Sequence, residues 1–403
     1  MGVDFSITTH ITSFKEHDGI KINYSTKRII DSELFIKSNN LLFEKDIKEQ
    51  SIECFETPFY KAFYKTADSD FDFDIFASSF YLLSRYEEYL PHTKDEYGRY
   101  SHKNSLAFKE GFLNLPLINI WVKDFSFVLK KKFSMFNVQY SMFKFIPTYD
   151  IDIAYSYKHK GFVRNIGGFF KSPSLKRLLV LLRLQKDPFD TFDKLESLHQ
   201  QYNLQPLYFF LLAEKNSVYD KNILPHTNAM QKLVKNIASK YTTGIHPSWQ
   251  SGDDISLITE EKKFLSNLSN ATITHSRQHY IRFNLPEGYE QLIEGGITDD
   301  YSMGYGSING FRASTASSFN WFDLQKNKET QLRIHPFCYM EANSLYEQKF
   351  TPAEAFDELM YYYEICKEVN GTLITIWHNH TIGDDKFFDG WRKMYEQFLE
   401  RIS

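Results

Sequence analysis

The sequence predicts an α/β protein in which a (β/α) barrel follows a smaller N-terminal α+β domain. Three observations lead to this prediction. Strand-like and helix-like stretches alternate from about residue 142 onward, polar residues recur where these strands end, and residues 1–140 mix short alternating stretches with one periodic segment. Alternation of this kind indicates parallel strands joined by crossover helices. We therefore expect two domains, residues 1–140 and residues 141–403.

The N-terminal part contains one clear helical pattern. In DIFASSFYLLSRYEEYL (74–90), apolar residues recur at helical spacing, and Pro91 follows the segment. This pattern predicts a helix that ends before the proline. The stretches GIKINYS and SELFIKS alternate in the manner of short strands. Residues 1–140 are therefore expected to form a small α+β domain, without an evident group of catalytic residues.

The C-terminal part begins with the strand SMFKFIPTYD, which ends at Asp150. Amphipathic helices are then expected in DTFDKLESLHQQYNL, in 227–240 and in 259–269, each followed by an apolar strand. PEGYEQLIEGG has the proline and glycine that helices prefer at their two ends. TPAEAFDELMYYYEICKEVNG opens with a capping box formed by Thr351 and Glu354, and the strand TLITIWH follows it.

Polar residues lie where the predicted strands finish, and this favours a barrel over an open sheet. In a barrel the carboxyl ends of all strands converge on one face, which carries the active site. Separate strands would therefore bring these residues to a single mouth. They are Asp150, Asp152, His246, Arg277, His279, Asp299, Asp300 and His378.

The composition excludes several classes of protein. A net charge of −4 argues against a general nucleic-acid-binding protein. The three cysteines are far apart and form no CxxC motif, so neither a disulfide framework nor a thiolate zinc site is expected. No uncharged apolar run reaches the roughly 18 residues of a membrane span, and the N-terminus lacks the apolar run of a signal peptide. A cytoplasmic protein is expected, and the aromatic share of 17% is compatible with a carbohydrate-binding groove.

The aspartates of PTYDIDIAYSY (147–157) interrupt an otherwise apolar and aromatic run. Side chains two residues apart in a strand point to the same side, so Asp150 and Asp152 should lie together. One carboxylate can then bind a metal ion while the other accepts a proton from water. In the structural alternative, the pair caps backbone N–H groups at the start of a loop.

Histidines at other strand ends could complete a metal site. His246 precedes a proline, which favours an extended backbone, and His279 lies two residues after Arg277. Two histidines and a carboxylate form a recurring catalytic zinc arrangement that leaves a position open for water. His378 or His380 could then serve as a general acid. Each of these residues alone is more often structural, so their recurrence at successive strand ends carries the prediction.

The order of these motifs resembles the polysaccharide deacetylase superfamily (NodB homology, carbohydrate esterase 4). Asp-x-Asp at 150–152 is followed by His-Pro-Ser at 246–248, Ser-Arg-x-His at 276–279, Gly-Phe-Arg at 310–312 and Trp-His at 377–378. The segments FYLLSRYEEYLPHTKDEYGRYS and DYSMGYGSINGFRASTASSFNWFDL are similar to a Bacteroidetes-type branch with an extra N-terminal domain. The resemblance implies a distorted (β/α) barrel of the NodB type, a divalent metal ion and removal of an acetyl group from a sugar.

The resemblance also implies roles for individual residues. Asp150 matches the catalytic base, and Arg277 matches the arginine that orients it. Asp152 and His246 match two metal ligands, and His378 matches the histidine that acts as general acid. His380 remains an alternative for that last role.

The sequence departs from the family pattern at one ligand. The usual second histidine lies four residues after the first, and that position holds Gln250. We infer that His279 supplies the missing nitrogen to a divalent metal, with zinc the expected ion. If His279 does not reach the metal, the site has one histidine and is weak or inactive.

Substrate-binding residues are expected among aromatic and cationic side chains. Trp249 and Tyr305 could stack on sugar rings, and Arg312 could hold an acidic sugar or pair with Asp299 or Asp300. The glycines of GYGSINGFR (304–312) miss the dinucleotide-binding spacing, so this stretch is expected to be a substrate-facing loop or a tight turn.

Together these observations predict a metal-dependent hydrolase that removes an acetyl group, N-acetyl rather than O-acetyl, from a sugar or polysaccharide precursor. The strongest alternative is a catalytically impaired relative that binds a glycan or a protein partner through the same groove. A third hypothesis places sugar binding in residues 1–140.

Overall fold

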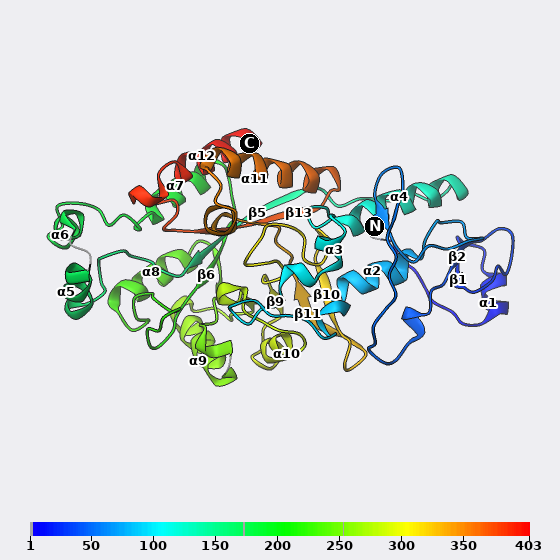
Figure 1. Ribbon diagram of the computed structural model, residues 1–403, viewed down its shortest axis with the longest axis horizontal. Coiled ribbons are helices and arrows are strands. Elements are labelled where there is room, and N and C mark those ends of the chain that lie inside the picture. Colours follow the sequence, from blue (N-terminus) through cyan, green and yellow to red (C-terminus); the bar gives the residue numbers. More distant parts are fainter. Residues whose placement is uncertain (1–2, 172–173, 253) are drawn as a thin grey trace.

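The computed structural model describes residues 3–171, 174–252 and 254–403, and its centre is a nine-stranded sheet with helices on both sides (Figure 1). The spatial order of the strands is β10-β11-β9-β8-β7-β6-β5-β13-β12, and every neighbouring pair is parallel except β10 and β11. The predicted mixed α/β class is therefore confirmed. The strands are β5 (Lys144–Ile151), β6 (Leu207–Phe210), β7 (Thr242–Ile245), β8 (His275–Ser276), β9 (Asp299–Asp300), β10 (Phe319–Asp323), β11 (Lys328–Ile334), β12 (Tyr339–Met340) and β13 (Thr372–His378).

One stretch of chain joins the two halves of the sheet. β11 pairs with β9, whereas β12, which follows it after residues 335–338, pairs with β13. Residues 328–340 therefore contact strands that lie on opposite sides of β5 in the strand order.

The helices that connect the strands agree with the amphipathic patterns of the sequence. The predicted capping box is confirmed, because the Thr351 side chain accepts from the backbone of Glu354 and the Glu354 side chain accepts from that of Thr351. α9 begins earlier than predicted, since Asp254 caps it by accepting from Ser256 N. The helices are α5 (Phe162–Lys171), α6 (Leu175–Leu181), α7 (Phe192–Gln201), α8 (Asn228–Ala238), α9 (Ile255–Ser269), α10 (Glu287–Glu294), α11 (Pro352–Glu368) and α12 (Trp391–Ile402).

The N-terminal part holds short elements around the helices α2 and α4. The predicted strands are present as the parallel pair β1 (Ile22–Ser25) and β2 (Leu34–Lys37). The helix predicted over 74–90 ends earlier, because Arg85 has a left-handed backbone with φ 55°. The sequence patterns did not predict α4. The remaining elements here are α1 (Ile11–Glu16), the 3-10 turn η1 (Leu41–Phe43), β3 (Phe55–Glu56), β4 (Lys61–Ala62), α2 (Ile75–Leu83), the 3-10 turns η2 (Tyr86–Glu88) and η3 (His102–Asn104), α3 (Leu106–Lys109) and α4 (Leu117–Lys132).

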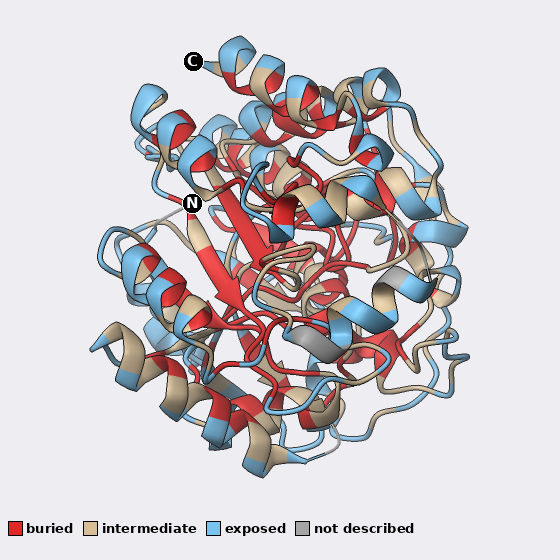
Figure 2. Ribbon diagram, turned by 90° about the vertical axis from the view of Figure 1, so that its left-hand side faces the viewer, coloured by how far each residue is buried: buried red, intermediate tan, exposed pale blue. Residues whose placement is uncertain are grey.

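Buried apolar residues form two clusters. One surrounds the sheet and is drawn from residues between Tyr149 and Leu399, and the other fills the N-terminal part but also takes in Tyr305 and Leu324. Figure 2 shows the buried strands in red inside helices whose outer faces are exposed. The division near residue 140 stays a prediction. Within the described residues, no helix has the length and apolar character needed to cross a membrane.

A buried ion cluster ties the N-terminal part to the rest of the chain. Glu88 accepts from Arg312 Nε and Nη2 at 2.8 and 2.5 Å and from Arg85 Nε at 2.8 Å. All three side chains are almost fully buried. Burial alone would raise the pKa of Glu88, but Arg312 and Arg85 outweigh it and lower that pKa to about 2. The turn at Arg85 therefore places one carboxylate between two guanidinium groups.

We expect Glu88→Gln to destabilise the folded protein strongly, because it removes the counter-charge of the buried Arg312 and one of the two carboxylates that pair with the buried Arg85. The free energy of unfolding should fall by about 3–5 kcal/mol, as measured by urea denaturation. Glu96→Gln, at an exposed carboxylate of the same region, is the matched control and should unfold like the wild type. Equal stability of Glu88→Gln and the control would contradict the assigned role of the cluster.

Candidate metal centre

The two aspartates of the Asp-x-Asp motif lie at the carboxyl end of β5, near the middle of the sheet. Asp150 is the last strand residue but one, and its backbone is in register with His378 of β13 and Phe209 of β6. Asp152 follows the strand, and its side chain keeps 17% of its surface exposed. Both carboxylates therefore face the edge of the sheet at which the parallel strands end.

Two histidines from the next strands approach Asp152. His246 Nε2 lies 3.1 Å from Asp152 Oδ1, and His279 Nε2 lies 3.5 Å from Asp152 Oδ2. One ligand atom from each of the three residues lies within 4.8 Å of the other two. His246 follows β7, and His279 begins a 3-10 turn, η5 (His279–Ile281), soon after β8. Adjacent parallel strands thus bring together residues that are far apart in the sequence.

The second nitrogen of each histidine is already engaged. His246 Nδ1 lies 2.6 Å from the Arg277 carbonyl oxygen, and His279 Nδ1 lies 3.1 Å from Asp220 Oδ1. A partner on Nδ1 orients the ring and leaves Nε2 to face the site, as in metal-binding histidines. Asp152 Oδ1 is buried, and within the described residues it accepts no hydrogen bond of good geometry. This carboxylate and two imidazoles are a donor set that suits zinc.

Gln250 does not take part in this cluster. Its side-chain amide donates to Asp220 Oδ2 at 3.1 Å, and Asp220 Oδ1 also accepts from Trp249 N at 2.9 Å. His279, the histidine inferred from the sequence, lies against Asp152 instead. Asp220 is a site residue that the sequence reasoning missed, because it lies in the loop after β6 rather than at a strand end.

Arg277 holds the other aspartate. Its Nη1 donates to Asp150 Oδ1 at 2.9 Å and to Thr148 Oγ1 at 2.6 Å, and its Nε donates to the Tyr301 carbonyl oxygen at 3.0 Å. Asp150 Oδ2 lies 3.8 Å from His246 Nε2. The guanidinium therefore fixes one oxygen of Asp150 and leaves the other toward the histidine cluster.

His378 lies on the opposite side of Asp152, at the end of β13. Its Nε2 lies 3.4 Å from Asp152 Oδ2, and its Nδ1 lies 2.8 Å from Glu341 Oε1. Glu341 also accepts from His378 N and Thr381 Oγ1. Burial alone would lower the pKa of His378, but the Glu341 and Asp152 carboxylates outweigh it and raise that pKa well above the usual value. Glu341 was also missed by the sequence reasoning.

His380 has different surroundings. Its ring lies against Phe189 and Phe388, and its Nδ1 is buried without a hydrogen-bond partner in the described structure. Burial and the neighbouring His378 lower the pKa of His380 to about 3. A neutral imidazole cannot donate a proton as an imidazolium does, so of the two rings only that of His378 is held in the charged form.

The residues predicted to bind substrate separate into two groups. Trp249 is partly exposed and stacks on Tyr219 with ring centroids 3.8 Å apart. Tyr305 and Arg312 are 2% and 1% exposed, which leaves them no surface for a sugar. The pairing of Arg312 with Asp299 or Asp300 is wrong, because Arg312 pairs with Glu88. Tyr305 and Arg312 belong instead to the junction with the N-terminal part, which the sequence pattern could not show.

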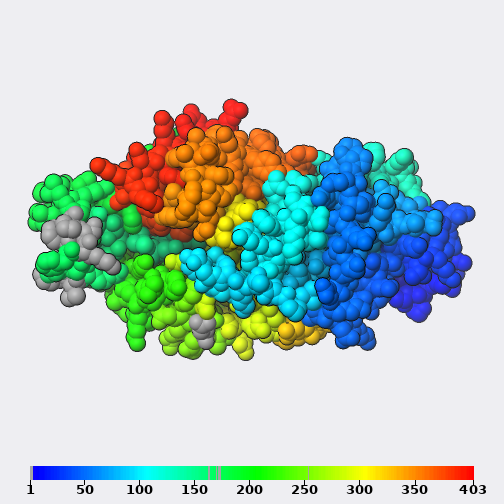
Figure 3. All heavy atoms as spheres, in the orientation of Figure 1, coloured from blue at the N-terminus to red at the C-terminus, as the bar shows by residue number. Residues whose placement is uncertain are grey.

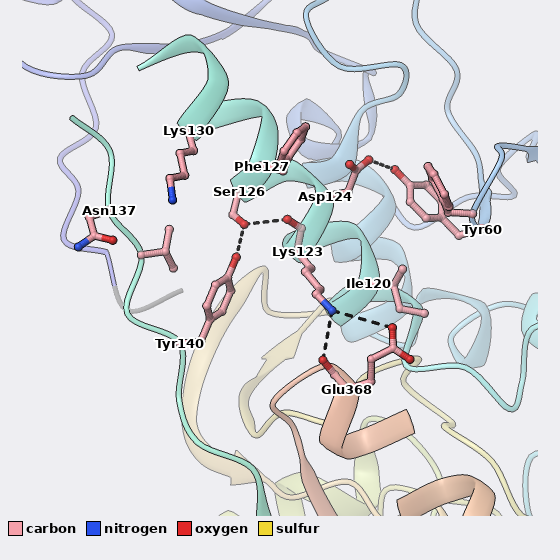
Figure 4. Close-up of a pocket in the computed structure, with 12 residues that line it drawn as sticks. Tyr60, Ile120, Lys123, Asp124, Ser126, Phe127, Lys130, Asn137, Tyr140 and Glu368 are labelled. Carbon is pink, nitrogen blue, oxygen red and sulfur yellow. Dashed lines mark hydrogen bonds and ion pairs between the residues drawn. The ribbon is translucent and has the colours of Figure 1, made fainter. Parts of the chain in front are cut away.

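A surface pocket of about 510 Å³ lies elsewhere, between α4, the loop near Tyr140 and the end of α11 (Figure 4). Phe59, Phe127 and Lys130 line it. Asp124 contacts Tyr60, and Lys123 pairs with Glu368 across the pocket. The elements that form this pocket therefore differ from those that carry the side chains clustered around Asp152.

The charges around His279 predict that metal binding releases a proton. Burial alone would lower the pKa of His279, but Asp152 and Asp220 raise it to about 9. Below that pH the ring is protonated and an ion must displace the proton, whereas above it the competition disappears. We expect about one proton released per zinc at pH 7.5 and a smaller release once the pH exceeds the pKa of His279.

The measurement is zinc titration calorimetry in buffers of different ionisation enthalpy. Equal heats in all buffers at pH 7.5, after correction for dilution, would contradict a protonated His279 in the metal-free protein.

Comparisons with known proteins complete the description. Residues 1–134 match a family of unknown function, DUF7033, and a search of the curated proteins found no match. A Mycobacterium smegmatis protein named as a polysaccharide deacetylase is 11% identical with a TM-score of 0.42, over 66% of this chain and 86% of that chain. A Pseudomonas aeruginosa PAO1 protein of the same description is 10% identical with a TM-score of 0.42, over 64% and 84%. The peptidoglycan N-acetylglucosamine deacetylase Bc1960 is 11% identical with a TM-score of 0.34, over 66% and 89%. Likenesses this distant carry no argument about function, so any assignment depends on the site.

Proposed function

We propose that this protein is a metal-dependent hydrolase that removes an acetyl group, N-acetyl rather than O-acetyl, from a sugar or polysaccharide precursor. The observation that carries the proposal is the cluster of Asp152, His246 and His279 beside the Asp150–Arg277 pair. The resemblance of the motifs to polysaccharide deacetylases supplies the class of substrate.

Asp152, His246 and His279 would hold the ion, and zinc fits this donor set. When bound, the ion supplies a Lewis acid for the acetyl carbonyl and a water of lowered pKa. Asp220 acts through His279, because it fixes the orientation of that ring.

Asp150 is the proposed base. Arg277 binds its Oδ1, so the free oxygen Oδ2 is the atom that takes the proton from the attacking water. A carboxylate kept in this orientation needs no rearrangement when the proton moves.

His378 is the proposed acid. Its Nε2 points to the cluster while Glu341 holds Nδ1, so Nε2 gives its proton to the departing nitrogen as the C–N bond breaks. Water thus gives its oxygen to the acetyl carbon and a proton to Asp150. The products are the free amine and acetic acid, which loses its proton to become acetate, and proton exchange with solvent returns Asp150 to the carboxylate and His378 to the imidazolium.

We also propose that the sheet forms a distorted (β/α) barrel of the NodB type. The pairing of residues 328–340 with β9 at one end and β13 at the other supports closure through this segment. The division into domains 1–140 and 141–403 belongs to the same proposal.

Metal content distinguishes the proposed metal-dependent enzyme from the alternative, a catalytically impaired protein that only binds a glycan or a protein partner. Elemental analysis of the purified chain should find about one zinc ion per chain, retained in Gln250→Ala and lost in His279→Ala. His279→Ala should also lose hydrolysis of acetylated sugars. Loss of zinc in Gln250→Ala with retention in His279→Ala would contradict the ligand set, and a wild type that binds no metal after reconstitution would contradict the enzyme.

Asp150→Asn should keep the metal but lose the base. Because the amide cannot take a proton, turnover of an acetylated sugar should fall by about 10²–10⁴ while zinc content stays unchanged. Asp193→Asn, at an almost fully exposed carboxylate on α7, is the matched control and should keep full turnover. Full activity in Asp150→Asn would exclude this residue as the base.

A further inference from the structure

Four partly exposed aromatic side chains gather beside the candidate metal centre. The Tyr97 ring centroid lies 6.3 Å from that of Tyr219, 6.2 Å from that of Trp249 and 5.3 Å from that of Tyr280. We call these four residues the ring cluster. Tyr219, Trp249 and Tyr280 follow β6, β7 and β8, whereas Tyr97 comes from the N-terminal part.

Tyr280 connects the ring cluster to the metal centre. Its ring centroid lies 4.6 Å from that of His279, the residue that precedes it. The ring cluster is therefore adjacent to the proposed metal ligands.

Hydrogen bonds and an ion pair hold the segment that carries Tyr97 next to this site. In residues 94–100, which we call the brace loop, Asp95 accepts from Tyr97 N and Arg99 N at 3.0 Å and pairs with Arg99 Nε at 2.7 Å. Arg99 Nη1 then donates to the Tyr280 carbonyl oxygen at 2.7 Å. In Figure 3 this cyan part of the chain lies over the middle of the molecule, between green and orange atoms.

Two backbone features accompany the hydrogen bond from Arg99 to the Tyr280 carbonyl oxygen. A Cβ at Gly306 would lie 2.0 Å from Arg99 Nη1 and 3.0 Å from the Tyr280 carbonyl oxygen, so a larger residue there would displace the guanidinium. Tyr280 and Ile281 both have left-handed backbones, with φ 59° and 55°. Such conformations cost free energy in non-glycine residues and persist where surrounding contacts impose them. The hydrogen bond from Arg99 is one such contact.

A second aromatic pair is formed by partly exposed side chains outside the ring cluster. Tyr346 and Phe387 are 38% and 64% exposed, and their rings stack with centroids 6.0 Å apart. Tyr346 belongs to a π-helical turn, η6 (Asn343–Glu347), which follows Glu341, the partner of His378. Burial and then the Glu341 and Tyr280 charges raise the pKa of Tyr346.

We infer that the N-terminal part completes the substrate groove, with Tyr97 and the rest of the ring cluster forming a stacking platform for a sugar unit beside the acetylated one. Sites for small molecules are commonly lined by aromatic side chains, and a partly exposed ring offers its face to the apolar face of a sugar. This inference rests on the proposed function and makes the substrate an oligosaccharide. Tyr97 sets specificity, and the chemistry does not depend on it.

The test compares Tyr97→Ala with Tyr97→Phe, which keeps the ring. In zinc-loaded protein, KM and kcat are measured for N-acetylglucosamine, for its pentasaccharide and for 4-nitrophenyl acetate. The platform predicts a KM for the pentasaccharide that rises about tenfold in Tyr97→Ala, with kcat and ester hydrolysis unchanged, and wild-type values in Tyr97→Phe. Tyr219→Ala should act in the same way as Tyr97→Ala.

Unchanged pentasaccharide KM in both alanine variants would overturn the platform, as would an equal loss on all three substrates. If the wild type hydrolyses none of them, the proposed function fails, and the platform is judged by binding instead. Quenching of protein fluorescence by the pentasaccharide, weakened about tenfold in Tyr97→Ala, would support it. Equal quenching in the two proteins, or none in the wild type, would overturn it.

Discussion

The candidate site depends on a single carboxylate that is surrounded by imidazoles. Burial opposes the charge of Asp152, but His279 and His246 outweigh it and hold the pKa of this carboxyl well below its usual range. A buried carboxylate needs a positive partner, which a zinc ion or a protonated histidine can provide. The same oxygen, Oδ2, faces both His279 and His378, so the proposed ligand and the proposed acid meet at one residue.

The surrounding residues keep this arrangement in place. Asp220 and Glu341 orient His279 and His378 through their Nδ1 atoms, and Arg99 binds the backbone directly after His279. The N-terminal part therefore supports the site as well as bordering it. The buried Glu88–Arg312 pair attaches that part to the sheet.

Sequence reasoning could identify the residues that end parallel strands, because the carboxyl ends of such strands lie at one edge. Asp150, His246 and His378 were found in this way, and the structure brings them together. Asp220 could not be identified from the sequence, because it lies in a loop whose path depends on tertiary packing. Arg312 was misjudged for a similar reason, since a buried partner on a distant segment leaves no local pattern.

The central claim is that Asp152, His246 and His279 hold one metal ion without Gln250. The most direct measurement is a crystal structure of the zinc-loaded protein, with the ion located by its anomalous scattering. The account predicts zinc within about 2.0–2.2 Å of the Nε2 atoms of His246 and His279 and of a carboxylate oxygen of Asp152. Zinc bound by Gln250 or at another place in the chain, with this cluster free of metal at saturating zinc, would contradict it.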